Sequence, residues 1–445
     1  MEIKFGTAGV RGITDLEITE ETCWKLGTAL VKKIGGTPEI ALGRDTRPGA
    51  DRLAGVCAAA MDAAGASVRN YGICPSPALS AMILGKNMAG GLMVTGSHMP
   101  YDRIGLIPLA ANGAIPPRES SSELADLANT LPPPNTAKGS LPEPSEFALD
   151  YLEFLLEACG SRLPGKGISV ALDPAGATGA GLVSRLMNDI GCNVQSIHDS
   201  REDFAPRRME PRADSVEELI ELVRESGADF GAAYDADCDR VLFVDETGKP
   251  LSEDLSAVIF AKYLFNGGPG TVVTPVNSSG LMKAVWKGRV EECIIGPPEI
   301  SIAAETHGAV FAYEESGKYF FPPGVMWADG ILATVMMARI LATSKKKLSA
   351  ITAEFPRHVQ IKRNVKVPDA QMASVLSGIR NSFSPAGAVL NDIDGLKYTW
   401  PDGSWLLIRL SGTEPLVRVY VDSPSPDRAR ELSDMGTAAV KHLIF

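Results

Sequence analysis

The stretch FGAAYDADCDRVLFV, residues 230–244, decides the fold class. It begins with an apolar run of strand length, Phe230 to Tyr234, and a polar cluster follows directly. Similar apolar runs alternate with helix-length amphipathic segments over most of the chain. This alternation is typical of βαβ units around mainly parallel sheets. The other predicted strands are 39–43, 91–95, 168–172, 271–274 and 309–313.

Charged clusters follow four of the predicted strands. They are GRDTR (43–47), TGSHMP (95–100), DADCDR (235–240) and EESGK (314–318). In open α/β sheets, ligands bind beyond the carboxyl ends of the strands. Four charged strand ends therefore predict several domains that face one cleft.

The length of 445 residues is too great for a single hydrophobic core. The proline-rich segment 131–143 indicates a linker, because its prolines neither pair in a sheet nor continue a helix. We expect three α/β domains and a smaller C-terminal α+β module of short strands with one terminal helix. The predicted domains are 1–140 with the serine loop, 141–245 with the acidic loop, 246–357 with the EESGK loop, and 358–445.

Three local signals are also informative. Ser215 and Glu218 have capping-box spacing, which predicts a helix start there, and Gly227 predicts its end. The apolar segment from Gly330 to Thr343 predicts another helix. GATGAG at 176–181 lacks the Lys-Ser/Thr of a P-loop and predicts a tight strand-to-helix turn.

Composition narrows the function classes. Hydrophobic residues make up 45% and charged residues 22%, as in globular proteins. The net charge of −11 argues against a nucleic-acid partner. Uncharged apolar runs of about 18 residues are absent from the sequence, so we expect no membrane association. Seven scattered cysteines without a CxxC pair, and an N-terminus without a signal-peptide core, favour a reduced, cytoplasmic protein.

Asp235, Asp237 and Asp239 are candidate metal ligands. In an extended segment, alternate side chains point the same way, so the three carboxylates could converge on one hard cation. Oxygen ligands suit Mg²⁺. A calcium EF-hand is excluded because Arg240 occupies the position that needs Gly. A solvated acidic turn is the alternative.

Two further clusters have both a functional and an ordinary interpretation. Ser97 and His98 follow a buried strand, where the serine is either a nucleophile or a turn former, and His98 a base or a structural donor. RLSGTEPLVR at 409–418 offers two guanidinium groups, two hydroxyls and a glycine, which suit a phosphate. An ordinary polar loop is the alternative for that stretch.

In this order, FGTAGVRG, TGSHMP, DADCDR, YEESG and RLSGTEPLVR resemble the motifs of the α-D-phosphohexomutase family over essentially the whole chain. The family includes phosphoglucomutases, phosphomannomutases and phosphoglucosamine mutases. The resemblance implies four domains around a central cleft, the first three of related α/β topology and the last a phosphate-binding module. It also implies interconversion of hexose 1-phosphate and 6-phosphate through a phosphoserine and a bisphosphorylated intermediate, with Mg²⁺ and a hexose bisphosphate such as glucose 1,6-bisphosphate as activator.

The resemblance assigns roles to individual residues. Ser97 is the expected phosphoserine and supplies an oxygen to the Mg²⁺ site of the three aspartates. Arg11 and Arg240 are expected near the transferred phosphate, and Glu314 and Ser316 on the sugar hydroxyls. The expected clamp on the non-reacting phosphate consists of Arg409, Ser411, Gly412, Thr413 and Arg418.

Two positions depart from the family pattern. The family usually has Asn-Gly-x-Lys after the serine loop, but aligning Gly105 with that glycine places Ile104 and Ile107 at the Asn and Lys. Lys318 also stands where a His often follows Ser-Gly. We expect His98, Lys318 or Arg103 to take over proton transfer. Cys238, unusual between the carboxylates, is expected to fill space.

Phosphoglucomutase or phosphomannomutase activity is our main prediction, with phosphoglucosamine mutase as an alternative. The changed proton-transfer positions also permit a phosphosugar phosphatase or bisphosphate synthase on the same scaffold. A non-catalytic sugar-phosphate-binding protein is the third possibility. The expected partner is a small phosphosugar, and the sequence does not indicate which sugar or which oligomeric state.

Overall fold

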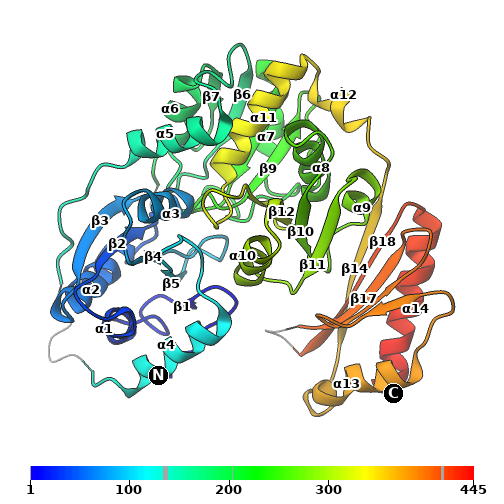
Figure 1. The fold of residues 1–445 in the computed structure, drawn as a ribbon, viewed down its shortest axis with the longest axis horizontal. Coiled ribbons are helices and arrows are strands. Elements are labelled where there is room, and N and C mark those ends of the chain that lie inside the picture. The colour runs from blue at the N-terminus through cyan, green and yellow to red at the C-terminus, as the bar shows by residue number, and fades with distance from the viewer. Residues whose placement is uncertain (1, 134–138, 203, 412–414, 445) are drawn as a thin grey trace.

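The structure is a computed structural model that describes residues 2–133, 139–202, 204–411 and 415–444. Its described residues form four sheets, each built from one continuous part of the chain. The four sheets follow one another along an arc, from the N-terminal to the C-terminal part (Figure 1). Among the described helices, none combines the length and the apolar character needed to cross a membrane.

The first part contains a five-stranded mixed sheet. Its elements are β1 (Val10–Ile13), α1 (Glu20–Ile34), β2 (Glu39–Arg44), α2 (Ala50–Ala63), β3 (Ser67–Ile73), α3 (Ser76–Gly85), β4 (Gly90–Val94), β5 (Arg103–Leu109) and α4 (Arg118–Thr130). The strand order is β1-β5-β4-β2-β3. Strands β2, β3 and β4 are parallel, whereas β5 is antiparallel to both β4 and β1.

The second part contains a four-stranded sheet of order β7-β6-β8-β9. Its elements are α5 (Ala148–Cys159), β6 (Ser169–Asp173), α6 (Leu182–Asp189), β7 (Asn193–Ser196), α7 (Glu217–Ser226), β8 (Phe230–Tyr234) and β9 (Val241–Asp245). The GATGAG turn joins β6 to α6, as predicted. Helix α7 ends at Ser226, and its C-cap residue is Gly227, whose φ of 66° is left-handed.

The third part repeats this arrangement with the order β11-β10-β12-β13. Its elements are α8 (Glu253–Leu264), β10 (Thr271–Pro275), α9 (Leu281–Val285), β11 (Arg289–Cys293), α10 (Pro297–Thr306), β12 (Ala309–Glu314), β13 (Lys318–Phe320), α11 (Gly330–Ser344) and α12 (Leu348–Thr352). The predicted apolar helix is α11, and the Asp329 side chain caps its N-terminus.

The fourth part is an antiparallel sheet of order β14-β18-β17-β16-β15 with two helices. Its elements are β14 (Val359–Lys366), α13 (Asp369–Ser382), β15 (Val389–Asn391), β16 (Leu396–Thr399), β17 (Trp405–Leu410), β18 (Leu416–Ser423) and α14 (Pro426–Ile444). The predicted smaller α+β module with short strands and a terminal helix is confirmed, but β14 and β18 are longer, with eight residues each, and α13 is a second helix.

The first three parts share one topology. In each, the first three strands of the shared unit are parallel and the fourth is antiparallel, with the spatial order second-first-third-fourth, and β1 is an addition to the first sheet. The loops 95–102, 235–240 and 315–317 all join the third of these strands to the fourth. The predicted serine, acidic and EESGK loops therefore occupy equivalent places in three related units.

Packing distinguishes the fourth part from the others. One apolar cluster includes Tyr71 of the first part, Tyr151 and Phe230 of the second and Phe260 of the third, so these parts share packed contacts. The fourth part has its own cluster, which includes Leu406. A smaller cluster joins Val276 to Trp405 across the junction of the third and fourth parts.

The predicted capping box is wrong. Helix α7 begins at Glu217, its N-cap residue is Val216, and no side-chain cap hydrogen bond forms there. The Ser215 hydroxyl instead donates to the carbonyl of Glu210 and accepts from the Arg212 N–H. The hydroxyl is therefore used by the preceding loop.

Candidate active site

Ser97 lies in the connection between β4 and β5. Its φ of 48° is in the left-handed region, which is unfavourable for a residue with a side chain, and it is 1% exposed. Its Oγ donates to Oδ2 of Asp235 at 2.8 Å, and Nδ1 of His98 lies 3.3 Å from the Ser97 Oγ. The strained backbone thus holds a serine hydroxyl against the acidic loop of the second part.

A buried guanidinium group supports the serine loop. Arg47, in the cluster after β2, is 2% exposed, and Asp45 forms an ion pair with it at 3.2 Å. Asp45 also accepts from the Thr95 hydroxyl at 2.9 Å. The Nη atoms of Arg47 donate to the carbonyls of Ser97, Met99, Pro100 and Arg103. Four contacts from one rigid group fix the path of the loop.

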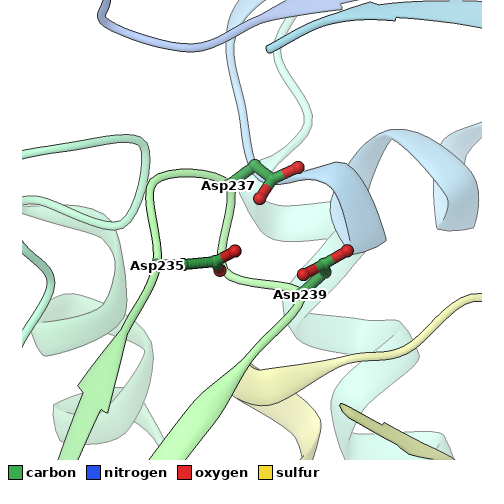
Figure 2. Close-up of side chains that lie close together, drawn as sticks. All are labelled: Asp235, Asp237 and Asp239. Carbon is green, nitrogen blue, oxygen red and sulfur yellow. The ribbon is translucent and has the colours of Figure 1, made fainter. Parts of the chain in front are cut away.

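Asp235, Asp237 and Asp239 lie on the connection between β8 and β9 (Figure 2). They are almost fully buried, and their ligand atoms lie within 4.8 Å of one another. The segment is a turn in which Cys238 has a φ of 58°. The expected extended conformation is therefore wrong, and the carboxylates converge because the loop turns tightly. The Cys238 side chain lies 3.6 Å from the Thr178 hydroxyl, in the core.

The acidic loop fits a divalent cation. Oδ1 of Asp237 and Oδ1 of Asp239 are buried and have no hydrogen-bond partner among the described residues. Leaving carboxylate oxygens buried without a partner costs free energy, and a cation would remove this cost. Three converging carboxylates are a ligand set that suits Mg²⁺.

The three carboxylates differ in how their surroundings affect protonation. Burial and the neighbouring Asp237 and Asp239 raise the pKa of Asp235 well above its usual range. Burial and Asp239 raise the pKa of Asp237 to about 6. Burial also opposes ionisation of Asp239, but Lys318 and Arg240 outweigh it and lower that pKa. Ionising all three carboxylates would therefore give the cluster more negative charge than its protein partners neutralise.

Two cationic side chains reach the acidic loop. Lys318, the first residue of β13, pairs with Oδ2 of Asp239 at 2.7 Å and is 5% exposed. Arg240 follows the aspartates, and its Nε lies 3.8 Å from Oδ2 of Asp235. Its Nη1 pairs with Glu210 at 2.8 Å. Three parts of the chain thus contribute to one charged centre: Ser97 from the first, the aspartates from the second and Lys318 from the third.

His98 is neutral in this environment. Burial lowers the pKa of the imidazole, and the positive charges of Arg240 and Arg11 lower it further. A neutral imidazole has one nitrogen that accepts a proton. The neutral imidazole therefore has an acceptor nitrogen beside Ser97, and the negative charge of a phosphate bound there would raise its pKa and strengthen it as a base.

A cleft of 860 Å³ brings together seven of the sixteen predicted site residues. It is bounded by the N-terminal segment, α4, the loop before α10 and the fourth part. The predicted residues that line it are Arg11, His98, Arg240, Glu314, Lys318, Arg409 and Arg418. The serine and the three aspartates lie buried beside it.

The remaining predicted residues have other positions. Arg103 does not line the cleft: it begins β5, and its carbonyl accepts from Arg47. Ser316 is not a lining residue, although its Oγ is buried without a hydrogen-bond partner among the described residues. Ser411 lies near Arg418, with Nη2 to Oγ at 3.5 Å. Gly412 and Thr413 lie outside the described residues.

The two positions that depart from the family pattern lie inside the protein. Ile104 and Ile107 belong to β5, are at most 1% exposed and pack in two different apolar clusters. Neither side chain replaces a cleft residue.

Sequence reasoning missed three supporting residues. Ser76, at the start of α3, donates to Oδ2 of Asp237 at 2.6 Å. Glu210 holds Arg240, and Arg47 holds the serine loop. The GRDTR cluster was identified at a strand end, but no role was predicted for it. Ser76 and Glu210 lie in segments with no motif that could have identified them.

Four family models match successive parts of this chain. Their descriptions are phosphoglucomutase/phosphomannomutase alpha/beta/alpha domains I, II and III and the C-terminal domain of the same family. They match residues 2–133, 149–248, 252–359 and 363–438.

Curated relatives and solved structures agree with these matches. The chain is 31% identical to a phosphoglucosamine mutase of Exiguobacterium, over 95% of this chain and 94% of the relative. It is 30% identical to a phosphoglucomutase/phosphomannomutase of Thermococcus kodakarensis, over 97% of each. The crystal structure of a phosphoglucomutase/phosphomannomutase family protein from Burkholderia thailandensis has the same fold, with a TM-score of 0.83 and 22% identity, over 98% of this chain and 97% of that one.

Proposed function

Since this chain belongs to the phosphoglucomutase/phosphomannomutase family, we propose that it interconverts hexose 1-phosphates and 6-phosphates through a phosphorylated Ser97. As a phosphohexomutase it is an isomerase that acts as an intramolecular phosphotransferase. The observation that supports the role of Ser97 best is the 2.8 Å contact of its hydroxyl with Asp235 beside the charged cleft.

In the proposed reaction, phosphoserine donates its phosphoryl group to a sugar hydroxyl. The bond between phosphorus and the Ser97 oxygen breaks, a bond to the sugar oxygen forms, the sugar hydroxyl proton goes to a base, and the released Ser97 oxygen takes up a proton to become a hydroxyl. The bisphosphorylated sugar then turns over, and its other phosphate returns to Ser97. A hexose bisphosphate, glucose 1,6-bisphosphate for a glucose substrate, would reload a dephosphorylated serine and so act as activator.

Phosphoryl transfer depends on positioning and on neutralisation of charge more than on covalent help. Arg11 and Arg240 line the cleft and are proposed to hold the transferred phosphate. Arg409 and Arg418 are proposed to clamp the non-reacting phosphate, together with Ser411, Gly412 and Thr413. Glu314 and Ser316 have buried oxygens without hydrogen-bond partners among the described residues, which supports contacts with sugar hydroxyls.

The proposed ligands of Mg²⁺ are Asp235, Asp237 and Asp239, with an oxygen of the Ser97 phosphate. When bound, the cation would supply positive charge that stabilises the transferring phosphoryl group. The unpartnered oxygens of Asp237 and Asp239 support this proposal. Ser76 and Lys318 would orient two of the carboxylates through their hydrogen bonds.

We propose that His98 accepts the sugar hydroxyl proton and that Lys318 assists. His98 lines the cleft, is neutral and lies next to the reacting serine oxygen. Lys318 also lines the cleft, where it neutralises Asp239. Arg103 is a weaker candidate because it does not line the cleft.

The main proposal for the substrate is glucose or mannose phosphate. Glucosamine phosphate is a second candidate, because the unpartnered carboxylate oxygen of Glu314 in the cleft would accept from an amino sugar's ammonium group. The relatives named above include mutases of both kinds.

An assay of the 1-phosphates of glucose, mannose and glucosamine, with Mg²⁺ and trace bisphosphate, tests the proposal. We expect 6-phosphate to form, and formation to disappear in Ser97→Ala. Release of inorganic phosphate without 6-phosphate would instead identify a phosphatase. A bisphosphorylated product that accumulates would identify a synthase, and binding of all three sugars without turnover would identify a non-catalytic protein.

The domain borders and the cellular location are two further proposals. We propose domain borders near residues 140, 245 and 357, which are supported by the confinement of each sheet to one part. We also propose a cytoplasmic location, which is supported by seven cysteines that are all buried and unpaired.

A further inference from the structure

We propose that Asp394 is the positioning residue for Arg409, and that it sets the place of the phosphate clamp relative to the third part of the chain. The inference rests on the proposed function, since it concerns how the proposed clamp is held. Asp394 lies in the turn between β15 and β16, and no family motif identified above includes it.

The turn brings the carboxylate directly onto Arg409. Nε of Arg409 donates to Oδ1 of Asp394 at 2.8 Å, and both side chains are less than one-fifth exposed. Gly395 makes this approach possible. Its φ is 95°, and a Cβ at that position would lie 2.6 Å from the carbonyl oxygen of Ile408 and 3.1 Å from Cβ of Arg409. The contact fixes one edge of the guanidinium group from outside the clamp loop.

The same carboxylate reaches the third part of the chain. The N–H of Ile295, just beyond β11, donates to Oδ2 of Asp394 at 3.0 Å. Ile295 and Arg409 both line the cleft. Each oxygen of Asp394 therefore contacts a residue from a different part of the chain, so the position of the clamp is tied to that of the third part.

Ile295 also contacts the first part. Its carbonyl accepts from Nη2 of Arg118 on α4 at 3.0 Å. Asp394 thus belongs to a chain of hydrogen bonds that links Arg118, Ile295 and Arg409, and so links three parts of the molecule along one side of the cleft. A charged hydrogen bond with partly buried partners is stronger than a neutral one. Asp394 is the charged member that orients the clamp.

This arrangement predicts a specific kinetic effect. The clamp holds the phosphate that does not react, so its disorder weakens binding more than it slows chemistry. We expect Asp394→Ala to raise KM for the 1-phosphate and for the 6-phosphate about tenfold, and kcat to change less than about twofold. Inorganic phosphate, used as a competitive inhibitor, would bind about tenfold more weakly.

Asp392→Asn is the matched control. Asp392 lies two residues away and pairs with Arg380 on the surface at 2.5 Å, away from the clamp. The KM of the Asp392→Asn variant is expected to equal that of the wild type. Asp394→Asn has one acceptor oxygen for two donors, so it is expected to lie between the wild type and Asp394→Ala. Thermal unfolding of each variant checks that it is folded.

The double variant Asp394→Ala/Arg409→Ala separates positioning from simple packing. If Asp394 acts through Arg409, the double variant binds inorganic phosphate no more than about twofold weaker than Arg409→Ala alone. Full additivity, or a KM of Asp394→Ala equal to that of Asp392→Asn while Arg409→Ala raises it, would overturn the proposal. If Arg409→Ala leaves KM unchanged, Arg409 does not bind the non-reacting phosphate, and the proposed positioning role of Asp394 is wrong as well.

Discussion

His98 and Lys318 reach Ser97 and the acidic loop from two different parts of the chain. His98 follows Ser97 directly, and Lys318 reaches the acidic loop from β13. Both line the cleft, whereas Ile107, at the position of the family's usual Lys, is buried in the core. In the proposed mechanism His98 accepts the proton of the sugar hydroxyl, and the Lys318 ammonium group, which neutralises Asp239, assists.

We expect His98→Ala and Lys318→Ala each to lower kcat about 100-fold, the usual size of a general-base effect. Arg103→Ala is the control, with turnover within about twofold of the wild type because Arg103 does not line the cleft. Stopped-flow measurement of a single turnover with phosphorylated enzyme reports the chemical step alone. Full turnover in both variants would show that neither residue transfers the proton.

The raised pKa of Asp254, a residue outside the proposed active site, predicts that the stability of the protein depends on pH. Burial and the nearby Glu315 raise the pKa of Asp254 to about 7. The folded protein therefore holds this proton up to about pH 7, whereas the unfolded chain releases it near pH 4. Between these values the unfolded state binds fewer protons, so the free energy of unfolding falls as the pH rises, by up to about 4 kcal/mol in total.

Asp254→Asn removes this titration but keeps an oxygen for the Ser279 N–H and the Tyr313 hydroxyl. Its stability relative to the wild type is expected to rise from pH 5 to pH 8, as measured by urea unfolding at each pH. The surface variant Asp392→Asn should show a much smaller trend. A constant difference between Asp254→Asn and the wild type would contradict the expected pKa.

For single residues, the chemical role of a side chain was easier to predict than its contacts. The aspartates and Ser97 belong to short motifs, and their chemistry follows from the side chains. Ser76 and Asp237 are 161 positions apart in sequence, and nothing local in the sequence indicates that they meet. The convergence of the carboxylates was expected for the wrong geometric reason, because a left-handed Cys238 cannot be recognised from the sequence.

Among the elements, the serine loop depends on close packing of its backbone against Arg47. A Cβ added at Gly96 would lie 2.3 Å from Cζ of Arg47, and that guanidinium group is held by four carbonyls. The group cannot move aside without losing these hydrogen bonds. The loop and the arginine therefore form one rigid unit.

We expect Gly96→Ala to cost about 1–3 kcal/mol of stability, as overpacking does, and to abolish most turnover because Ser97 is displaced from Asp235. Gly85→Ala, at the end of α3, is the matched control: no heavy atom lies within 4 Å of its added Cβ, and we expect a change below about 0.5 kcal/mol. Chemical unfolding and the mutase assay measure the two effects. Wild-type turnover in Gly96→Ala would show that the loop tolerates displacement.

Six strands could be predicted well because each of them is a short apolar run next to a polar cluster. The 230–234 strand matches β8 in full, and the other predicted strands differ by a residue or two at their ends. The capping box failed because Ser215 has competing backbone partners in its own loop. A local pattern predicts a cap only when no other acceptor or donor is closer.

For the whole molecule, sequence could predict related units but not how they meet. The shared order of strands places three loops at equivalent points, and their polar motifs predicted that they would face one cleft. The contacts that join the fourth part, such as Lys397 with Glu292 and Asp422 with Ser279, connect residues more than 100 positions apart. Such contacts depend on the orientation of complete domains and leave no periodic signal.

The proposed Mg²⁺ site would join Ser97 of the first part to the acidic loop of the second, so its loading should stabilise the whole molecule. A cation that binds only the folded state adds about 2.7 kcal/mol at 100 times its dissociation constant. We therefore expect EDTA to lower the unfolding temperature of the wild type and Mg²⁺ to restore it.

In Asp237→Asn the response to Mg²⁺ should be lost, while the remaining amide oxygen still accepts a hydrogen bond from Ser76. Because that substitution also relieves carboxylate repulsion, the variant should be more stable than the wild type in EDTA and less stable in Mg²⁺. Asp392→Asn, with its acidic loop intact, should respond to Mg²⁺ as the wild type does. If neither EDTA nor Mg²⁺ changes the unfolding temperature of the wild type, the three aspartates do not hold the cation in the folded state.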